Sequence, residues 1–182
     1  MKFSRVPLNR AYRLLHPKLV VLVVARDGDG RVNGMTAAWA MPVSARPPLI
    51  CVSIAPKRYT YGLIKETGEF TVNVLTSDMV SEAHYFGTVS GREEDKFSRS
   101  RLTLLDGSKI STPIVREAAA ALECRLYSEH EAGDHVLVIG EVVAAWAKPE
   151  VFTGTYEPDR ISLLLHLGGD RYTCTASRVI RP

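Results

Sequence analysis

Cysteine is scarce in this chain of 182 residues, which has only Cys51, Cys124 and Cys174. They are far apart and odd in number, so neither a disulfide framework nor a close-spaced zinc motif is indicated. An excess of charge of one sign is also lacking, because 23 basic and 20 acidic residues leave a formal net charge of +3. That charge is too small to indicate a nucleic acid or an anionic membrane as a partner. We therefore expect a protein of the reducing cytoplasm with neither partner.

Long hydrophobic runs are absent as well. The longest clean apolar run, residues 19–25, is far too short to span a bilayer. Basic residues precede it, as in a signal peptide, but the residues that follow form a turn at 27–30 and offer no cleavage site. Linkers, repeats and compositional breaks are missing too. With 46% hydrophobic and 24% charged residues, the chain is expected to fold as one globular domain.

Several familiar chemical motifs are not found. No GxGxxG follows an expected strand, no GxSxG nucleophile elbow occurs, and no phosphate-binding GxxxxGK[ST] loop is present. Two histidines and three carboxylates fall within residues 129–135, which raises the question of a metal site. Alternation along a strand and the intervening turn would scatter these side chains. We therefore expect no metal there, but a polar hairpin with one useful histidine.

Alternation of apolar and polar residues and an abundance of Val and Ile predict strands at residues 19–26, 31–38, 49–55, 69–76, 121–127, 135–147 and 161–167. Short helices are expected at residues 8–15, 58–67 and 78–85, the second of them ended by Gly68. Residues 42–48, which include three prolines, and residues 109–113 are expected to be irregular. Many strands, few helices and close turns predict a closed β-barrel with small helical additions.

The first candidate site is the segment Lys57-Arg58-Tyr59-Thr60. Here an expected strand ends and a helix begins, and free backbone N–H groups at a helix N-terminus attract anions, phosphate above all. Lys57 and Arg58 add positive charge, and the two hydroxyl groups add donors. An exposed basic turn with an ordinary helix cap is the alternative interpretation.

The second candidate is Asn-Gly-Met-Thr-Ala-Ala-Trp at residues 33–39. Small residues at 34, 37 and 38 would let a flat ring approach the backbone closely. Asn33 and Thr36 would hydrogen-bond the polar edge of such a ring. The alternative is a plain strand with a buried Trp39.

The third candidate is the loop at residues 84–91 together with Lys96. Gly87 and Gly91 allow the backbone to form an anion-holding nest, with Ser90 nearby. A solvated loop is the alternative interpretation.

These segments occur in one order with others, at residues 47–54, 59–64, 69–73, 86–87, 90–92, 95–97, 122–124 and His135 ahead of 139–142. The ordered set resembles the flavin reductase-like, FMN-binding split-barrel family, and within it flavoredoxin-type proteins. The resemblance implies a mainly β fold: a six-stranded Greek-key split β-barrel with short peripheral helices, formed by residues 1–182 as a single FMN-binding domain. It also implies a homodimer with FMN at the subunit interface.

The resemblance further implies a role for each candidate segment. The residues that would line the flavin ring are Met35, Thr36, Ala37, Ala38 and Trp39. The ribityl and phosphate groups would be held by Ser53, Lys57, Arg58, Tyr59 and Thr60. The second loop would contribute Phe86, Gly87, Ser90 and Lys96. His135 would lie near the flavin or a nicotinamide pocket as the catalytic residue, whereas His166 takes a place where many relatives have an aromatic residue.

The expected function is therefore that of an FMN-containing oxidoreductase. It would accept electrons from NAD(P)H and pass them to free flavin, ferric iron or a redox partner protein. A flavoredoxin-like electron carrier that uses no nicotinamide is the alternative, and a barrel that binds a ligand without redox chemistry is a second one. Because the flavin carries the redox chemistry, none of the three cysteines is expected to be a redox-active thiol.

Overall fold

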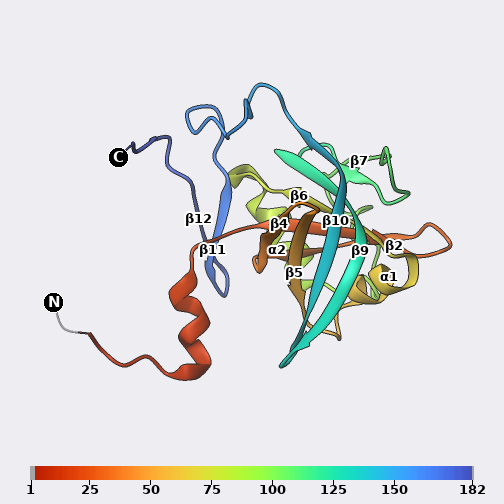
Figure 1. Cartoon of the computed structure of the whole chain (residues 1–182), viewed down its shortest axis with the longest axis horizontal. Coiled ribbons are helices and arrows are strands. Elements are labelled where there is room, and N and C mark those ends of the chain that lie inside the picture. The colour runs from red at the N-terminus through yellow and green to blue at the C-terminus, as the bar shows by residue number, and fades with distance from the viewer. Residues whose placement is uncertain (1–2, 182) are drawn as a thin grey trace.

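The computed structural model describes residues 3–181, which form a mainly β fold with short helices around it (Figure 1). The helices are the 3₁₀ segments η1 (Leu8–Leu15) and η2 (Ser77–Met79) and the α-helices α1 (Tyr59–Thr67) and α2 (Val80–Thr88). The strands are β1 (Lys18–Leu19), β2 (Val21–Arg26), β3 (Val32–Ala37), β4 (Ala40–Ala45), β5 (Pro48–Ile54), β6 (Glu69–Val74), β7 (Leu104–Leu105), β8 (Ile114–Val115), β9 (Ala120–Ala132), β10 (His135–Ala147), β11 (Leu164–Gly168) and β12 (Arg171–Cys174). None of the helices in residues 3–181 is long and apolar enough to cross a membrane.

The main sheet is antiparallel and has the strand order β3-β2-β6-β9-β10-β5-β4. A three-stranded sheet, β1-β11-β12, and a pair, β7-β8, complete the fold. The mainly β barrel with short peripheral helices is thus confirmed, but the main sheet has seven strands where six were expected. The extra strand is β4, so the expectation of an irregular stretch at 42–48 was wrong. Pro42 is tolerated because β4 lies at the edge of the sheet, where the side of the strand that faces away from β5 has no neighbouring strand to hydrogen-bond with.

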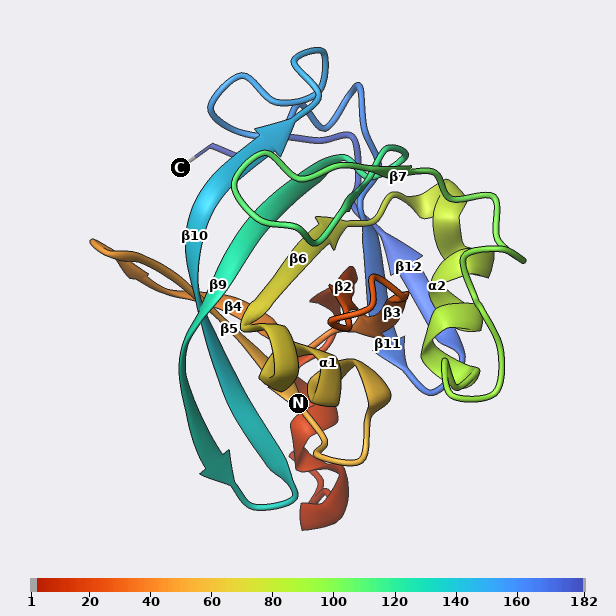
Figure 2. The ribbon, with the colours of Figure 1, turned by 90° about the vertical axis from the view of Figure 1, so that its right-hand side faces the viewer.

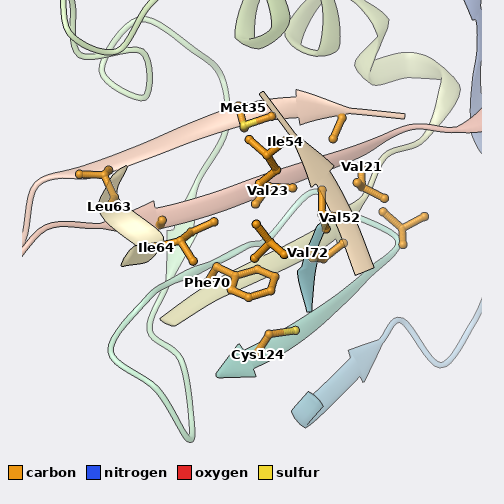
Figure 3. Close-up of a cluster of buried hydrophobic side chains, with 14 of the residues drawn as sticks. Val21, Val23, Met35, Val52, Ile54, Leu63, Ile64, Phe70, Val72 and Cys124 are labelled. Atoms are coloured by element: carbon orange, nitrogen blue, oxygen red, sulfur yellow. The ribbon is translucent and has the colours of Figure 1, made fainter. Parts of the chain in front are cut away.

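The core lies on both sides of β2, which explains the continuous apolar run in the sequence. Val21 and Val23 point into the barrel, where they pack with residues such as Phe70 and Ile54 (Figure 3). The alternate residues Leu22 and Val24 pack against a second cluster under α2. Every residue from Val21 to Ala25 is at most 2% exposed. Burial on both faces gives β2 a large share of the hydrophobic stabilisation.

The long hairpin β9–β10 wraps across the barrel and extends past the rest of the sheet (Figure 2). Its tight approach to the core depends on Gly140, because a Cβ there would lie 2.4 Å from Cζ of Phe70. Gly133, with φ of 66°, makes the turn between the two strands. The hairpin predicted from the polar cluster at residues 129–135 is therefore confirmed, and its turn places His135 at the start of β10.

A buried carboxylate fixes the loop that joins β7 to β8. The side chain of Glu123, 0% exposed, accepts hydrogen bonds from the backbone N–H groups of Ser108, Lys109 and Ile110 and from the Trp146 indole. Burial alone would raise the pKa of this carboxyl, but the donors outweigh it and lower the pKa to about 2. The loop is irregular, as expected for residues 109–113, yet firmly tied to β9.

Other elements differ from the prediction in their bounds. The strand expected at 121–127 runs on to Ala132, and the last expected strand begins only at Leu164. It pairs with β12, which the alternation did not predict. The helix expected at residues 78–85 is formed by η2 and α2, and α2 continues to Thr88, so Phe86 and Gly87 lie in the helix and not in the expected loop. The helix at residues 8–15 is present as η1, projects from the barrel and buries none of its residues (Figure 1).

Candidate functional site

Three adjoining cavities lie beside β3, and Arg58 lines all of them. The basic cavity, of about 170 Å³, is lined by Asn33, Lys57, Arg58, Tyr59, Thr60, Ser90, Gly91, Arg92 and Lys96 among others. The central cleft, of about 590 Å³, is lined by Met35, Thr36, Ala37, Ala38, Trp39, Ser53, Lys57, Arg58, Asp134 and His135 among others. The third cavity, of about 440 Å³, lies between α2 and the β11–β12 hairpin. The three segments singled out in the sequence therefore meet in one region.

The basic cavity is built on the N-terminus of α1. β5 ends at Ile54, a turn closed by the Arg58 N–H bonding to the Ala55 carbonyl at 3.0 Å follows, and α1 begins at Tyr59. No side chain among the described residues caps this helix. The Tyr61 N–H donates to the Arg58 carbonyl at 3.1 Å, which leaves the N–H groups of Tyr59 and Thr60 as the candidate donors to an anion at this helix end.

Cationic side chains surround this helix end. Lys57, Arg58 and Arg92 are exposed, and Arg92 donates a hydrogen bond to the Lys57 carbonyl at 3.1 Å. The guanidinium carbons of Arg31 and Arg92 lie 5.7 and 5.1 Å from the centre of the Tyr59 ring. Sequence reasoning missed Arg31 and Arg92. Arg92 stands in a segment that carries the family resemblance, but only the fold brings it against α1.

Lys96 forms the floor of the basic cavity and is 3% exposed. Its Nζ donates to the carbonyls of Phe86 and Val89, each at 3.1 Å. Burial and the nearby charge of Arg58 lower the pKa of Lys96 to about 8, although Glu94 acts in the opposite direction. The ammonium group thus sits in a field of uncompensated positive charge, which a bound anion would neutralise.

Asn33 and Thr60 use their polar groups on each other, not on a ligand ring. The Asn33 amide donates to the Thr60 hydroxyl at 2.8 Å, and both residues are buried. A Cβ at Gly91 would lie 2.0 Å from Oδ1 of Asn33, so Gly91 lets the loop close over this pair. Asn33 borders the basic cavity and not the central cleft. The expectation that Asn33 hydrogen-bonds the polar edge of a bound ring stays a prediction.

The central cleft meets the backbone of β3. The side chains of Met35 and Ala37 belong to the barrel core, and Figure 3 shows Met35 beside Ile54. Because these two side chains point inward, the strand presents mainly backbone and the small side chain of Ala38 to the cleft. Thr36 also lines the cleft, but its hydroxyl donates to the Ala83 carbonyl at 2.7 Å. A flat group can thus approach β3 closely, and a hydrogen bond from Thr36 to the edge of such a group stays a prediction.

Aromatic rings form the rim of the central cleft. Trp39 is 36% exposed, so the alternative of a buried tryptophan was wrong. Its ring lies 4.9 Å from the His135 ring at an interplanar angle of 33°, and 5.4 Å from the Tyr12 ring. Nδ1 of His135 donates to the exposed Asp134 carboxylate at 2.7 Å, which lowers the pKa of Asp134. In the neutral imidazole this bond leaves Nε2 as an acceptor. The backbone of Trp39 is fixed to β5, because the Ser53 N–H donates to the Trp39 carbonyl at 2.9 Å.

The second loop contributes less through side chains than expected. Phe86 is 1% exposed and its ring packs 4.9 Å from the Phe97 ring, but the residue borders the basic cavity, so its contact with a cofactor stays a prediction. What it offers to the site is the carbonyl that holds Lys96. Ser90 lines the basic cavity, where its hydroxyl accepts from the Arg92 N–H at 3.3 Å, and Gly87 lines the third cavity.

The remaining candidate groups lie apart from this region. Within residues 3–181, no cluster of three or more His, Cys, Asp or Glu side chains is placed to hold a metal ion. Cys51 and Cys124 are buried and Cys174 is exposed. Burial raises the pKa of Cys51 and raises that of Cys124 to about 12. Buried thiols of this kind are poor nucleophiles.

The sequence matches the family model described as "Flavin reductase like domain" over residues 12–172, and the chain belongs to that family. It is 38% identical over 92% of its length to an uncharacterized protein of Aeropyrum pernix, and spans 64% of that protein's length. It is 35% identical to a flavin reductase of Pseudomonas putida, over 70% of this chain and 71% of the other.

Solved structures resemble the whole chain. An FMN-binding protein from Thermus thermophilus with bound p-hydroxybenzaldehyde superposes with a TM-score of 0.88 and 34% identity, covering 100% of both chains. The flavoredoxin of Desulfovibrio vulgaris (Miyazaki F) superposes with a TM-score of 0.86 and 30% identity, covering 100% of this chain and 97% of the other.

Proposed function

We propose that this chain binds FMN and is an oxidoreductase that takes electrons from NAD(P)H and passes them to free flavin, ferric iron or a redox partner protein. The observation that carries the proposal is the junction at Arg58 of a cationic helix N-terminus with a cleft floored by strand backbone. A phosphate dianion suits the first, and a flat ring system suits the second. FMN joins the two groups in one molecule.

The residues present fit this cofactor. Lys96 carries buried positive charge that no ion pair neutralises among the described residues, and the first N–H groups of α1 are uncapped. Lys57, Arg58 and Arg92 would hold the phosphate, and residues 35–38, at the end of β3 and directly after it, would lie against the ring. Nothing in the lining marks an adenine pocket, so FMN is favoured over FAD. The FMN-binding protein and the flavoredoxin named above support flavin binding.

When bound, FMN supplies the hydride and electron-transfer chemistry, and the protein binds it, orients it and excludes water. Backbone and small side chains of β3 would position the ring. Trp39 and His135 would cover its rim, where the Asp134 carboxylate holds the imidazole in one tautomer. His135 would act on turnover more than on cofactor affinity, because its ring lies beside the Trp39 ring at the rim of the central cleft.

Visible absorbance of the purified protein, followed by anaerobic addition of NADH or NADPH, tests the proposal. We expect a flavin spectrum that bleaches on addition of one of the two nucleotides. Release of the cofactor by heat and its chromatography should give FMN. A protein that neither carries nor takes up flavin would be a barrel with a different ligand, and the proposal would be wrong.

A second candidate is a flavoredoxin-like carrier that takes electrons from another protein. The 30% identity to a flavoredoxin over the whole chain favours it, and the lining shows no separate motif for a nicotinamide. Such a carrier would show the flavin spectrum, yet neither NADH nor NADPH would bleach it. Reduction by dithionite would then confirm that the flavin is redox-active.

We propose in addition that the chain works as a homodimer. η1 buries none of its residues, and Leu8, Leu14 and Leu15 are 85%, 68% and 70% exposed. An isolated helix of this length is not stable in water and needs a surface to pack on. A second copy would cover η1 and would add a second wall to the open cleft beside Trp39.

Light scattering coupled to gel filtration tests the dimer. We expect twice the mass of one chain, and dissociation when Leu14 and Leu15 are both changed to Glu. The exposed Arg10 on the same helix provides a matched control, since Arg10→Glu should leave the dimer intact. A monomer that holds FMN tightly would contradict this proposal.

A further inference from the structure

Lys96 is the one lysine of residues 3–181 that is buried, and it also borders a cavity. The carbonyls that accept hydrogen bonds from its Nζ belong to Phe86, in the last turn of α2, and to Val89, which follows the helix. Nζ also lies 5.1 Å from the centre of the Phe86 ring. Flavin binding as proposed above uses the charge of this side chain and not its capacity to act as a nucleophile.

The two hydrogen bonds decide how a neutral Lys96 would be oriented. A protonated lysine has three N–H groups, and Lys96 donates two of them to the two carbonyls. No third acceptor of residues 3–181 lies within hydrogen-bonding distance of Nζ. When the group loses a proton, the remaining N–H groups can keep both bonds, and the lone pair takes the third position. The lone pair then points away from both carbonyls, and the open space that Lys96 borders is the basic cavity.

The surroundings of Lys96 also make the neutral form accessible. Burial and the charge of Arg58 lower the pKa of Lys96 from the ordinary 10.5 to about 8, although Glu94 raises it. At pH 8 about half of the Lys96 side chains are therefore neutral, against less than about 1% for an exposed lysine. A desolvated lysine beside another cation is the usual arrangement for an amine that attacks carbonyl carbon.

The rest of the lining indicates which carbonyl compound would enter. Lys57, Arg58 and Arg92 bring exposed positive charge to the cavity, and Ser90 adds a hydroxyl donor. These groups suit a phosphate. A volume of about 170 Å³ admits only a compound of a few carbon atoms beside that phosphate. An aldehyde is the electrophile that an amine attacks most readily and reversibly.

We propose that the basic cavity takes up a small aldehyde that bears a phosphate monoester, and that Lys96 forms an imine with it. The Nζ lone pair forms the bond to the carbonyl carbon, and the carbonyl oxygen leaves as water with both hydrogens of the neutral amine. A proton from solvent then charges the imine nitrogen. Neither an oxidant nor a reductant is needed, and the reaction is reversible.

The adduct would compete with a cofactor. Its nitrogen keeps a single hydrogen, which serves only one of the carbonyls of Phe86 and Val89, so the imine is expected to hydrolyse when the aldehyde is removed. While it lasts, its phosphate occupies the place that we propose for the phosphate of FMN. Exclusion of the flavin rests on the proposed function, whereas the reaction of Lys96 depends only on the cavity.

Reductive trapping tests the proposal on the full chain after any bound flavin has been removed. The protein is incubated at pH 8 with glyceraldehyde 3-phosphate and cyanoborohydride, which reduces the imine to a stable amine, and labelled peptides are identified by mass spectrometry. We expect Lys96 to be labelled about tenfold faster than the exposed Lys65 of α1. Glyceraldehyde, which lacks the phosphate, should label Lys96 about tenfold more slowly and Lys65 equally fast. Inorganic phosphate should slow the labelling of Lys96 alone.

Variants separate the phosphate contact from the nucleophile. Arg92→Met, at an exposed residue, should slow the labelling of Lys96 by glyceraldehyde 3-phosphate about tenfold and leave labelling by glyceraldehyde unchanged. Arg10→Met, at an exposed arginine of η1, is the matched control and should change neither rate. Lys96→Arg keeps the charge, and its folded protein should carry one label fewer. Equal labelling of Lys96 and Lys65 in the wild type, or a rate at Lys96 that does not depend on the phosphate, would overturn the proposal.

Addition of FMN separates this inference from the proposed function. If both are right, FMN protects Lys96 from the aldehyde and leaves the labelling of Lys65 unchanged. If the protein takes up no flavin and Lys96 is still labelled in a phosphate-dependent way, the imine stands and the flavin assignment falls. If FMN binds and the flavin-free protein shows no preferred labelling of Lys96, the imine proposal is wrong and the flavin assignment stands.

Discussion

Backbone N–H groups converge in two places in the molecule, and the two places differ in what those groups meet. In the loop between β7 and β8, backbone N–H groups converge on the carboxylate of Glu123, which is part of the chain. At the start of α1, backbone N–H groups and several cations converge on a cavity, and no side chain of residues 3–181 caps the helix. Backbone N–H donors are common to both places, whereas the cations belong to the start of α1.

The effects on pKa show the consequence of this difference. Around Glu123 the donors lower the pKa of the buried acid to about 2, because their hydrogen bonds stabilise the ionised carboxylate. Around Lys96 the pKa of a buried base falls to about 8, because burial and Arg58 oppose its charge and little compensates it. The donors of a structural site find their acceptor within the chain when it folds. In a binding site the donors and charges stay without a full partner until a ligand binds, so their electrostatic energy contributes to affinity.

The largest effect is expected at Glu123, where the carboxylate already occupies the converging donors. Glu123→Gln should lower the free energy of unfolding by about 3 kcal/mol, because an amide NH₂ would face donors that now share a buried carboxylate. Urea unfolding followed by circular dichroism measures this. Glu131→Gln, at an exposed carboxylate on the same strand, should change the value by less than about 0.5 kcal/mol. A loss as small at Glu123 as at Glu131 would show that the loop does not depend on the charge.

The same site predicts an acid dependence. The folded pKa of Glu123, about 2, lies below the ordinary 4.5, so its contribution is complete above pH 4.5 and is lost as the pH falls towards 2. The Glu123→Gln protein should lack this part of the dependence. Unfolding midpoints measured from pH 6 to pH 2.5 should therefore converge for the two proteins at the acid end. A difference between the two proteins that stays constant from pH 6 to pH 2.5 would show that the low pKa of Glu123 does not stabilise the fold.

At the basic cavity, Arg58→Ala should weaken FMN binding roughly ten- to hundredfold, since a charge-assisted hydrogen bond is worth about 1.5–3 kcal/mol. His135→Ala should weaken it less and lower turnover instead. Flavin fluorescence titration gives both affinities. If Arg58→Ala binds FMN as tightly as the wild type does, the phosphate is held elsewhere, with Lys96 the next candidate.

A smaller effect is expected from pH. Lys96 is protonated below its pKa of about 8, and only then attracts a phosphate dianion. FMN affinity should be level near pH 7 and fall by at most about tenfold per unit above pH 8. Lys96→Met should bind more weakly at pH 7 and show a flatter profile. Because Arg58 lowers the pKa of Lys96, the fall in the Arg58→Ala protein should move to higher pH.

The smallest effects are expected at the thiols. Cys174 is exposed and should react with a thiol reagent at once, whereas Cys51 and Cys124 should react only after unfolding. Replacing each in turn by alanine should leave NADH oxidation unchanged at equal FMN content. A large fall in turnover for any one would reveal a thiol step in the reaction.

Local signals in the sequence predicted the elements that local forces decide. The alternation of β10 gave residues 135–147, the bounds observed, and Gly68 ends α1 with φ of 68°. β4 was missed because an edge position, which is a property of the whole sheet, makes Pro42 acceptable. β12 was missed because its pairing with β11 depends on the preceding glycine turn.

The candidate site was predicted in its segments more than in its contacts. Lys57, Arg58 and the start of α1 lie together as expected, since they are neighbours in sequence. Asn33 turns to Thr60, and Phe86 turns into the core, because partners far along the chain satisfy them first. Arg31 and Arg92 reach Tyr59 only through the folding of distant loops. Which side of an element a residue faces was the information that the sequence lacked.

Arg58 borders all three cavities, and this position has a thermodynamic consequence. One guanidinium group cannot serve three occupants equally, so a ligand that draws it towards one cavity alters its supply of donors to the other two. Coupling of this kind is reciprocal: each ligand changes the affinity of another by the same factor that it experiences. A dissociation constant measured for one cavity therefore has meaning only when the contents of its neighbours are stated.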